Sequence, residues 1–288
     1  MLARRSTHHS TIRRTIIAVT LLLSTMALGK VTQPVAASPM HMGWSSFSTG
    51  NWEPEIPWPP EEAEVLGASL VQGWIAKGTK HQTPYYVYNS GVDGPTVAII
   101  GGVHGNEKAG WKAALEAKEI TVKRGRLLII PEANRPAVKA GKRTSSLGDL
   151  NRSFPRTKSD SPDNYLARSI WNLMLKYRPD WLVDLHEGDS YHLINKKSVG
   201  QTVIYYPVAK AAPAAKAMAK AASALVSNPK HAFSVLKYPV AGSLARAVSI
   251  RLGTKGMIVE TCNKQSLSLR KKEHLAAVNA LLKHLRMQ

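Results

Sequence analysis

The chain has 288 residues, of which 44% are hydrophobic, enough for one domain of ordinary size with a real core after a leader segment. Its 39 lysines and arginines outnumber its 19 aspartates and glutamates, and the formal net charge of +20 favours an anionic neighbourhood. The single cysteine, Cys262, excludes an intramolecular disulfide, and no recognised DNA- or RNA-binding motif points to nucleic acid as a partner.

The first residues have the pattern of an export signal. Two arginine pairs, Arg4-Arg5 and Arg13-Arg14, precede an apolar run over residues 15–28, and Val35-Ala36-Ala37 supplies the small residues of a cleavage site. We therefore predict a signal peptide at residues 1–37. The apolar run is too short and mixed to favour a stable transmembrane segment, and an uncleaved membrane anchor is the alternative.

A cleaved leader predicts a secreted protein or one associated with a bacterial cell envelope. The leader holds five basic residues and no acidic one, so the mature chain would keep a charge of +15. Anionic cell-wall polymers or membrane surfaces are the natural partners for that charge. A basic surface that only maintains solubility explains the charge equally well.

Residues 38–64 are rich in Trp and Pro, most densely from Trp52 to Pro60. Such a stretch cannot form a helix interior, so we predict an extended linker or a segment that lies across the domain surface. Its tryptophans are suited either to stacking on sugars or to docking onto the domain. The domain itself is predicted to cover residues 65–288.

From residue 65 onward, apolar runs typical of strands alternate with helical patterns. The predicted strands are residues 85–88, 96–100, 126–130, 181–185, 202–206, 233–236 and 256–260. The predicted helices are residues 108–119, 164–177, 211–226, 243–252 and 269–286. Several strands are continuously apolar, which is typical of burial on both faces. The pattern predicts a single α/β domain with a mixed, mostly parallel central sheet and helices on both faces.

Reactive side chains collect where the predicted strands end. A glycine-rich turn after strand 96–100 presents His104 and Glu107 three residues apart, and His186 follows strand 181–185. Imidazole and carboxylate groups are good zinc donors, and three protein ligands leave a position open, as in catalytic zinc sites. Because ligands gather at the carboxyl ends of strands, we predict one Zn²⁺ on His104, Glu107 and His186.

Two further features supply the rest of a hydrolytic site. Glu260 ends strand 256–260, where a buried carboxylate is costly unless it faces a metal or a cleft, so it is the candidate general base. A structural Glu paired with a basic residue is the alternative. The loop at residues 148–155 carries Asn151 and Arg152, and a guanidinium binds carboxylates or polarises a carbonyl oxygen as charge develops on it.

The combined pattern resembles the succinylglutamate desuccinylase/aspartoacylase family of the zinc carboxypeptidase superfamily. The matching motifs are His104-x-x-Glu107, Asp149-Leu150-Asn151-Arg152-x-Phe154, Asp184-Leu185-His186 and Glu260. The resemblance implies a zinc carboxypeptidase-like fold, zinc on the two histidines and Glu107, and Glu260 as general base and proton shuttle. It also implies that Asn151 and Arg152 grip a substrate carboxylate or the scissile carbonyl. Arg143 stands near a further family arginine, which implies a role in substrate binding.

Asp184-Leu185-His186 is followed by Glu187-Gly188-Asp189, which differs from the residues typical of aspartoacylase or desuccinylase members. We therefore expect an exported zinc-dependent amidohydrolase that cleaves an amide bond next to a carboxylate. Its substrate would be a small molecule or peptide with a free carboxylate, such as a cell-wall peptide. An N-acyl-amino-acid deacylase is the alternative within the same chemistry. A non-catalytic, basic cell-wall-binding protein is the alternative of another class.

Overall fold

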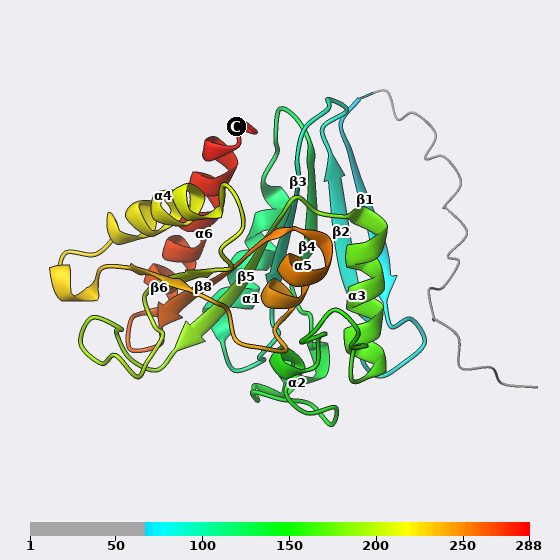
Figure 1. Cartoon of the computed structure of the whole chain (residues 1–288), viewed down its shortest axis with the longest axis horizontal. Helices are drawn as coiled ribbons and strands as arrows, with labels where there is room; N and C mark the ends of the chain where they lie inside the picture. The colour runs from blue at the N-terminus through cyan, green and yellow to red at the C-terminus, as the bar shows by residue number, and fades with distance from the viewer. Residues whose placement is uncertain (1–66) are drawn as a thin grey trace, which may run out of the picture. The chain divides into compact units, whose positions relative to one another are not determined.

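The computed structural model describes residues 67–288, so the predicted leader (1–37) and linker (38–64) lie outside the described residues. The described residues form one eight-stranded sheet in the order β1-β2-β4-β3-β5-β8-β6-β7 (Figure 1). The strands are β1 (Ser69–Ile75), β2 (Thr83–Asn89), β3 (Thr96–Gly101), β4 (Arg126–Ile130), β5 (Trp181–Gly188), β6 (Thr202–Tyr205), β7 (Ser234–Lys237) and β8 (Lys255–Cys262).

The strands at the centre of the sheet run in parallel. β3 pairs in parallel with β4 and β5, β5 pairs in parallel with β8, and β6 with β7. Antiparallel pairing joins β1 to β2, β2 to β4, and β6 to β8. This arrangement confirms the predicted mixed, mostly parallel sheet.

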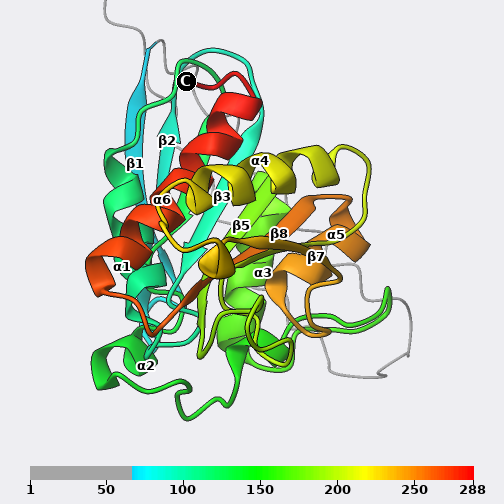
Figure 2. The same cartoon turned by 90° about the vertical axis from the view of Figure 1, so that its left-hand side faces the viewer.

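Helices cover both faces of the sheet, as the sequence predicts. They are α1 (Lys108–Glu116), α2 (Arg135–Ala140), α3 (Tyr165–Tyr177), α4 (Ala211–Ser223), α5 (Leu244–Leu252) and α6 (Leu267–His284). Side chains of α1, α4 and α6 pack on one face, where α4 and α6 lie side by side (Figure 2), and those of α3 and α5 pack on the other. Within residues 67–288, no helix has the length and apolar character needed to span a membrane.

Neighbouring residues of one strand contribute to two separate apolar cores. Ile99 of β3 shares a buried cluster with Ala113 of α1 and Val278 of α6. Ile100, the next residue, belongs to the cluster on the opposite face, together with Ile170 of α3. Side chains alternate between the two faces of a strand, so an unbroken apolar run is what a strand covered on both sides requires.

One strand and one α-helix of the structure were not predicted. β1 is an edge strand that pairs only with β2, and most of its side chains are exposed, so it lacks the apolar pattern of a buried strand. α2 is only six residues long and ends at Gly141, whose φ of 62° is left-handed. The predicted helix at residues 108–119 is α-helical only to Glu116 and continues as a short 3-10 turn, Ala117–Glu119.

A buried carboxylate, Glu273 of α6, lies in a polar network beside β8. The side-chain amide of Gln201 donates a hydrogen bond to its Oε1 at 3.1 Å, and Gln265 donates to Oε1 at 3.0 Å and to Oε2 at 2.8 Å. Burial raises the pKa of Glu273 to about 7, although the two amide donors act in the opposite direction. The folded protein therefore keeps a proton on this group at pH values where the unfolded chain has released it.

The replacement Glu273→Gln should remove a pH-dependent cost of folding. The folded pKa of about 7 exceeds the unfolded value of 4.5, so Glu273 destabilises the fold progressively as pH rises from 4.5 through 7. The difference in unfolding free energy between the variant and the parent protein should be about 2 kcal/mol more favourable to the variant at pH 8 than at pH 5. Urea unfolding at both pH values measures this difference. Glu119→Gln, at an exposed position, is the control, and an equal offset at the two pH values would contradict the assignment.

Candidate metal centre and active site

Three side chains from separate parts of the chain converge on one buried point. Nδ1 of His104 lies 2.7 Å from Oε1 of Glu107, and Nδ1 of His186 lies 2.8 Å from Oε2 of the same carboxylate. The two Nδ1 atoms are 3.2 Å apart, and one donor atom from each residue lies within 4.8 Å of the others. All three side chains are buried. The three predicted ligands therefore meet at the distances that shared coordination of one ion requires.

The register of the sheet brings these residues together. β3 and β5 are neighbours, with Gly101 opposite Leu185, so their carboxyl ends lie at the same level. Immediately after β3, Gly102 takes a left-handed φ of 71°, which a glycine adopts without strain, and the chain turns into α1. Glu107 is the N-cap residue of α1, while His186 belongs to β5 itself.

Two further carboxylates, those of Asp149 and Asp184, lie against the imidazole rings. Nε2 of His104 lies 2.9 Å from Oδ1 of Asp149, and Nε2 of His186 lies 3.0 Å from Oδ2 of the fully buried Asp184. A carboxylate on one ring nitrogen holds the other nitrogen toward a metal and raises its basicity. Both rings consequently direct Nδ1 toward Glu107.

The electrostatics of this cluster fit a divalent metal. Burial alone would raise the pKa of Glu107, but the two imidazoles hold it well below the ordinary range, so the carboxylate is charged. Burial alone would lower the pKa of His186, yet Asp184 and Glu107 hold it well above its usual value. The cluster thus favours positive charge, and two imidazole nitrogens with a carboxylate form a donor set suited to zinc.

Glu260 faces the same cavity from the neighbouring strand. β8 pairs with β5 so that Glu260 stands directly opposite His186. Its carboxyl group is largely buried, with 8% of the residue exposed, and burial raises its pKa to about 8. Nearby Glu107 and Asp184 raise this pKa further, whereas His186 and Arg143 lower it. A carboxyl group with a raised pKa, at the edge of a cavity and beside a metal cluster, is suited to accept and return a proton.

The cavity has a volume of about 740 Å³ and is lined by basic side chains and by the three residues of the His104–Glu107–His186 cluster. The predicted site residues that line it are His104, Glu107, Arg143, Asn151, Arg152, His186 and Glu260. An apolar wall is provided by Val199, Ile204, Val240 and Ile258. A cavity with apolar walls and a few convergent polar groups is the usual form of a small-molecule site.

Asn151 and Arg152 reach this cavity through a 3-10 turn, η2 (Leu150–Arg152). The turn begins at Asp149, whose Oδ1 accepts a hydrogen bond from the Asn151 N–H at 2.9 Å. Asn151 is buried and its Oδ1 has no hydrogen-bond partner within residues 67–288, while Arg152 is exposed and donates to the Asn151 carbonyl at 2.9 Å. The exposed guanidinium of Arg152 keeps further N–H donors with which it could bind a ligand.

Arg143 lies against the metal cluster. Its Nη1 is 3.2 Å from Oε1 of Glu107, and its Nη2 is 3.4 Å from Oδ2 of Asp149. Among residues 67–288, Arg143 forms an ion pair with Glu107 and Arg152 does not. The substrate-binding roles of Arg143, Asn151 and Arg152 remain predictions.

Sequence reasoning did not identify Arg270 as part of the site. Arg270 lies in α6, lines the cavity, and donates to the carboxylate of Glu187, which also accepts a hydrogen bond from the Ala109 N–H at the start of α1. The Glu187 N–H donates in turn to Oε2 of Glu107 at 3.1 Å. This chain of contacts connects α6 and the start of α1 to Glu107. Arg270 and Glu187 are 83 positions apart, and no local motif marks such a pair.

Comparison with known proteins is consistent with a hydrolase of this fold class. Residues 93–285 match the catalytic domain of the succinylglutamate desuccinylase/aspartoacylase family, and the chain belongs to that family. The family resemblance drawn from the sequence motifs is thereby confirmed. The matched residues thus correspond to the part of the family that is described as its catalytic domain.

One related enzyme is the N-alpha-acetyl-L-2,4-diaminobutyric acid deacetylase of Halomonas elongata, which is 38% identical over 104 residues. That alignment covers 33% of this chain and 29% of the deacetylase. The match thus spans less than a third of the length of the enzyme to which it is made.

Solved structures share the fold at low sequence identity. The tripeptide-bound cell shape determinant Csd4 of Helicobacter pylori superposes with a TM-score of 0.60 at 19% identity, over 77% of this chain and 56% of Csd4. A succinylglutamate desuccinylase/aspartoacylase of Rhodobacter sphaeroides superposes with a TM-score of 0.57 at 20% identity, over 78% of this chain and 67% of that protein. At these identities the likeness establishes the fold alone.

Replacing the buried carboxylate behind His186 should weaken metal binding without removing a ligand. In Asp184→Asn the group that orients the imidazole loses its charge, and metal affinity should fall by about 10- to 100-fold. Competition with a chromophoric chelator measures the metal affinity. An unchanged circular dichroism spectrum shows that the variant is folded. Asp93→Asn, at an exposed position far along the chain, is the matched control. Equal affinity in the two variants would contradict a positioning role for Asp184.

Proposed function

We propose that the protein is an exported, zinc-dependent amidohydrolase that cleaves an amide bond next to a carboxylate in a peptide. The observation that carries the proposal is the meeting of His104, Glu107 and His186 in one cavity with Glu260. Family membership supports amide hydrolysis, and the basic leader with its apolar run supports export. A zinc ion on the three ligands would supply a Lewis acid for the attacking water and the scissile carbonyl.

Glu260 carries the proton through the reaction. In its ionised form it accepts a proton from the water that attacks the carbonyl carbon, and the proton then passes to the leaving nitrogen as the C–N bond breaks. The products are a carboxylic acid and a free amine. The burial that raises the pKa of Glu260 makes the carboxylate a stronger base and the carboxylic acid stable enough to hold the proton between the two steps.

Arg143 and Arg152 have different roles in the proposed reaction because they lie in different parts of the cavity. Arg143 lies beside Glu107, so its guanidinium stands where negative charge develops on the carbonyl oxygen. Arg152 is exposed on η2, and its guanidinium donors suit the free carboxylate of a substrate. This arrangement favours a substrate whose carboxylate lies close to the bond that is cleaved.

Two substrate classes fit the chemistry. A cell-wall peptide is favoured by the predicted export and the charge of the chain, and Csd4, which shares the fold, is described as a D,L-carboxypeptidase and was solved with a tripeptide bound. An N-acyl amino acid is favoured by the similarity to the Halomonas elongata deacetylase. Incubating zinc-loaded protein with muropeptides and with N-acyl amino acids, and measuring the released amine, separates the two classes. No release from either class would contradict the proposed function.

Glu260→Gln should retain the metal and lose turnover. The amide matches the carboxylate in shape but cannot accept the proton, so kcat should fall by about 10²- to 10⁴-fold. Metal content by mass spectrometry and amine release are measured on the same preparation. The variant His104→Ala, which removes a ligand, should lose both metal and activity. Full activity in Glu260→Gln would remove the base assignment, and a metal-free parent protein that still binds cell walls would favour the non-catalytic alternative.

Arg152→Ala should act mainly on substrates that carry a free carboxylate. Loss of a charge-assisted hydrogen bond costs about 1.5–3 kcal/mol, so kcat/KM for such a substrate should fall by about 10- to 100-fold. The same substrate with its carboxylate amidated should be a poor substrate for both proteins and should show little difference between them. Arg168→Ala, at an exposed position on α3, is the matched control. An equal loss on both substrates would contradict recognition of the carboxylate by Arg152.

A further inference from the structure

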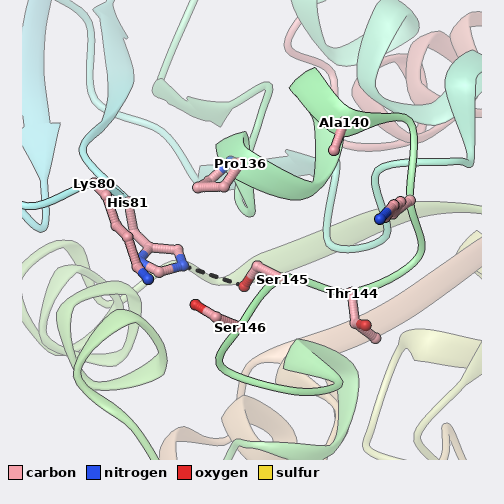
Figure 3. A pocket seen from close by; sticks show the side chains of 8 residues that line it. Lys80, His81, Pro136, Ala140, Thr144, Ser145 and Ser146 are labelled. Atoms are coloured by element: carbon pink, nitrogen blue, oxygen red, sulfur yellow. Dashed lines mark hydrogen bonds between the residues drawn. The ribbon is translucent and has the colours of Figure 1, made fainter.

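A second cavity, of about 410 Å³, shares no lining residue with the metal site (Figure 3). Three segments that are distant in sequence form its walls: the turn between β1 and β2, helix α2, and the loop that follows α2. Lys80 and His81 come from the first segment, and Lys142, Ser145 and Ser146 come from the third. The proposed amidohydrolase reaction uses none of these side chains.

His81 is fully buried and joins two of these segments. Its Nδ1 is hydrogen-bonded to the hydroxyl of Tyr165, and its Nε2 lies 3.2 Å from Oγ of Ser145. Burial lowers the pKa of His81, and the charge of the adjacent Lys80 lowers it further, so the ring is neutral at physiological pH. A neutral ring has one N–H donor and one acceptor nitrogen.

In one of the two neutral tautomers of His81, this network leaves the Ser145 hydroxyl able to act as a donor. When the Tyr165 hydroxyl donates to Nδ1, the proton of His81 is on Nε2 and is donated to Oγ of Ser145. The N–H of Leu147 points to the same oxygen at 3.4 Å. Two donors then converge on Oγ, so the hydroxyl hydrogen of Ser145 remains available to a ligand in the cavity.

The lining of the cavity carries only positive charge. Lys80 and Lys142 are exposed, and neither forms an ion pair within residues 67–288. Hydroxyl groups of Thr144 and Ser146 lie in the same lining, and no acidic residue is among the described residues that form it. Ammonium and hydroxyl donors that come from separate walls suit an anion with oxygens in several directions, as in a tetrahedral oxyanion, better than a planar carboxylate.

We propose that this cavity binds a phosphate-type oxyanion, which Lys80 and Lys142 attract and to which Ser145 and Ser146 donate hydrogen bonds. Inorganic phosphate and the phosphodiester of an anionic polymer present the same chemistry. The site adjoins the active site through one loop: Lys142 lines this cavity, while the next residue, Arg143, contacts Glu107. Binding here does not depend on amide hydrolysis, so the proposal stands or falls separately from the proposed function.

Titration of the zinc-loaded, ¹⁵N-labelled full chain with inorganic phosphate at constant ionic strength tests the site. The backbone amide resonances of Ser145 and Ser146 should shift and reach saturation. In the double variant Lys80→Ala/Lys142→Ala the affinity should fall by about tenfold or more, since two charged hydrogen-bond donors are lost. The double variant Lys77→Ala/Lys139→Ala has the same net charge, alters exposed lysines outside the lining, and should bind like the parent.

A second titration, with a polyglycerol-phosphate chain in place of inorganic phosphate, distinguishes a polymer ligand from the free ion. A polyglycerol-phosphate chain that shifts the same amides at a lower phosphate concentration than the inorganic ion identifies a polymer site. Equal or tighter binding of the inorganic ion identifies a site for free phosphate. The proposal is overturned if the two double variants bind with equal affinity. It is also overturned if no saturable shift occurs, or if the shifts are confined to residues around Glu107 and His186.

Discussion

The carboxylate of Glu107, buried between two imidazoles, is the interaction on which the rest of the site depends. Its Oε1 faces His104 and Arg143, and its Oε2 faces His186 and a backbone N–H. A buried anion costs several kcal/mol unless it is paired and hydrogen-bonded. The carboxylates of Asp149 and Asp184 lie against the two imidazole rings and add negative charge. Within residues 67–288, Arg143 is the only arginine or lysine that forms an ion pair with Glu107. A divalent cation among the three side chains would balance this excess. The pKa of Glu260 is raised mainly by burial, and the charges of Glu107 and Asp184 contribute to the rise.

Close backbone contacts at two glycines bring the charged residues of the cluster together. Helix α1 approaches β5 at Gly110, where a Cβ atom would lie 2.3 Å from the carbonyl oxygen of Leu185. That approach brings the start of α1, with Glu107, beside the end of β5, with His186. Gly105 packs in the same way against the backbone of Ala137, and its Cβ would lie 2.0 Å from the carbonyl carbon. The glycines around the His104 motif therefore allow the close approach that brings Glu107 beside His186, and they also shape the turn.

The central strands and the three residues of the His104–Glu107–His186 cluster could be predicted because their signals are local. Strand β3 and the first part of β5 are continuous apolar runs, and each is followed or ended by a histidine. The edge strand β1 could not be predicted because most of its side chains are exposed and it lacks an apolar pattern. The helix α2 could not be predicted because six residues are too few to show a helical period. Arg270 contacts Glu187 across 83 positions, and Gln201 contacts Glu273 across 72 positions. No local sequence motif marks either pair.

By itself, the sequence determined the fold class, the family, and the residue types that could bind a metal, because these depend on periodicity and on short motifs. Only the tertiary structure decided which imidazole nitrogens face Glu107, that Asp149 and Asp184 support them, and that Arg143 lies at the metal ligands while Arg152 does not. It also decided that Lys80 and Lys142, 62 positions apart in the printed sequence, line one cavity. The physical reason is that the direction of a side chain follows from strand register and helix packing, which are set by contacts between distant segments.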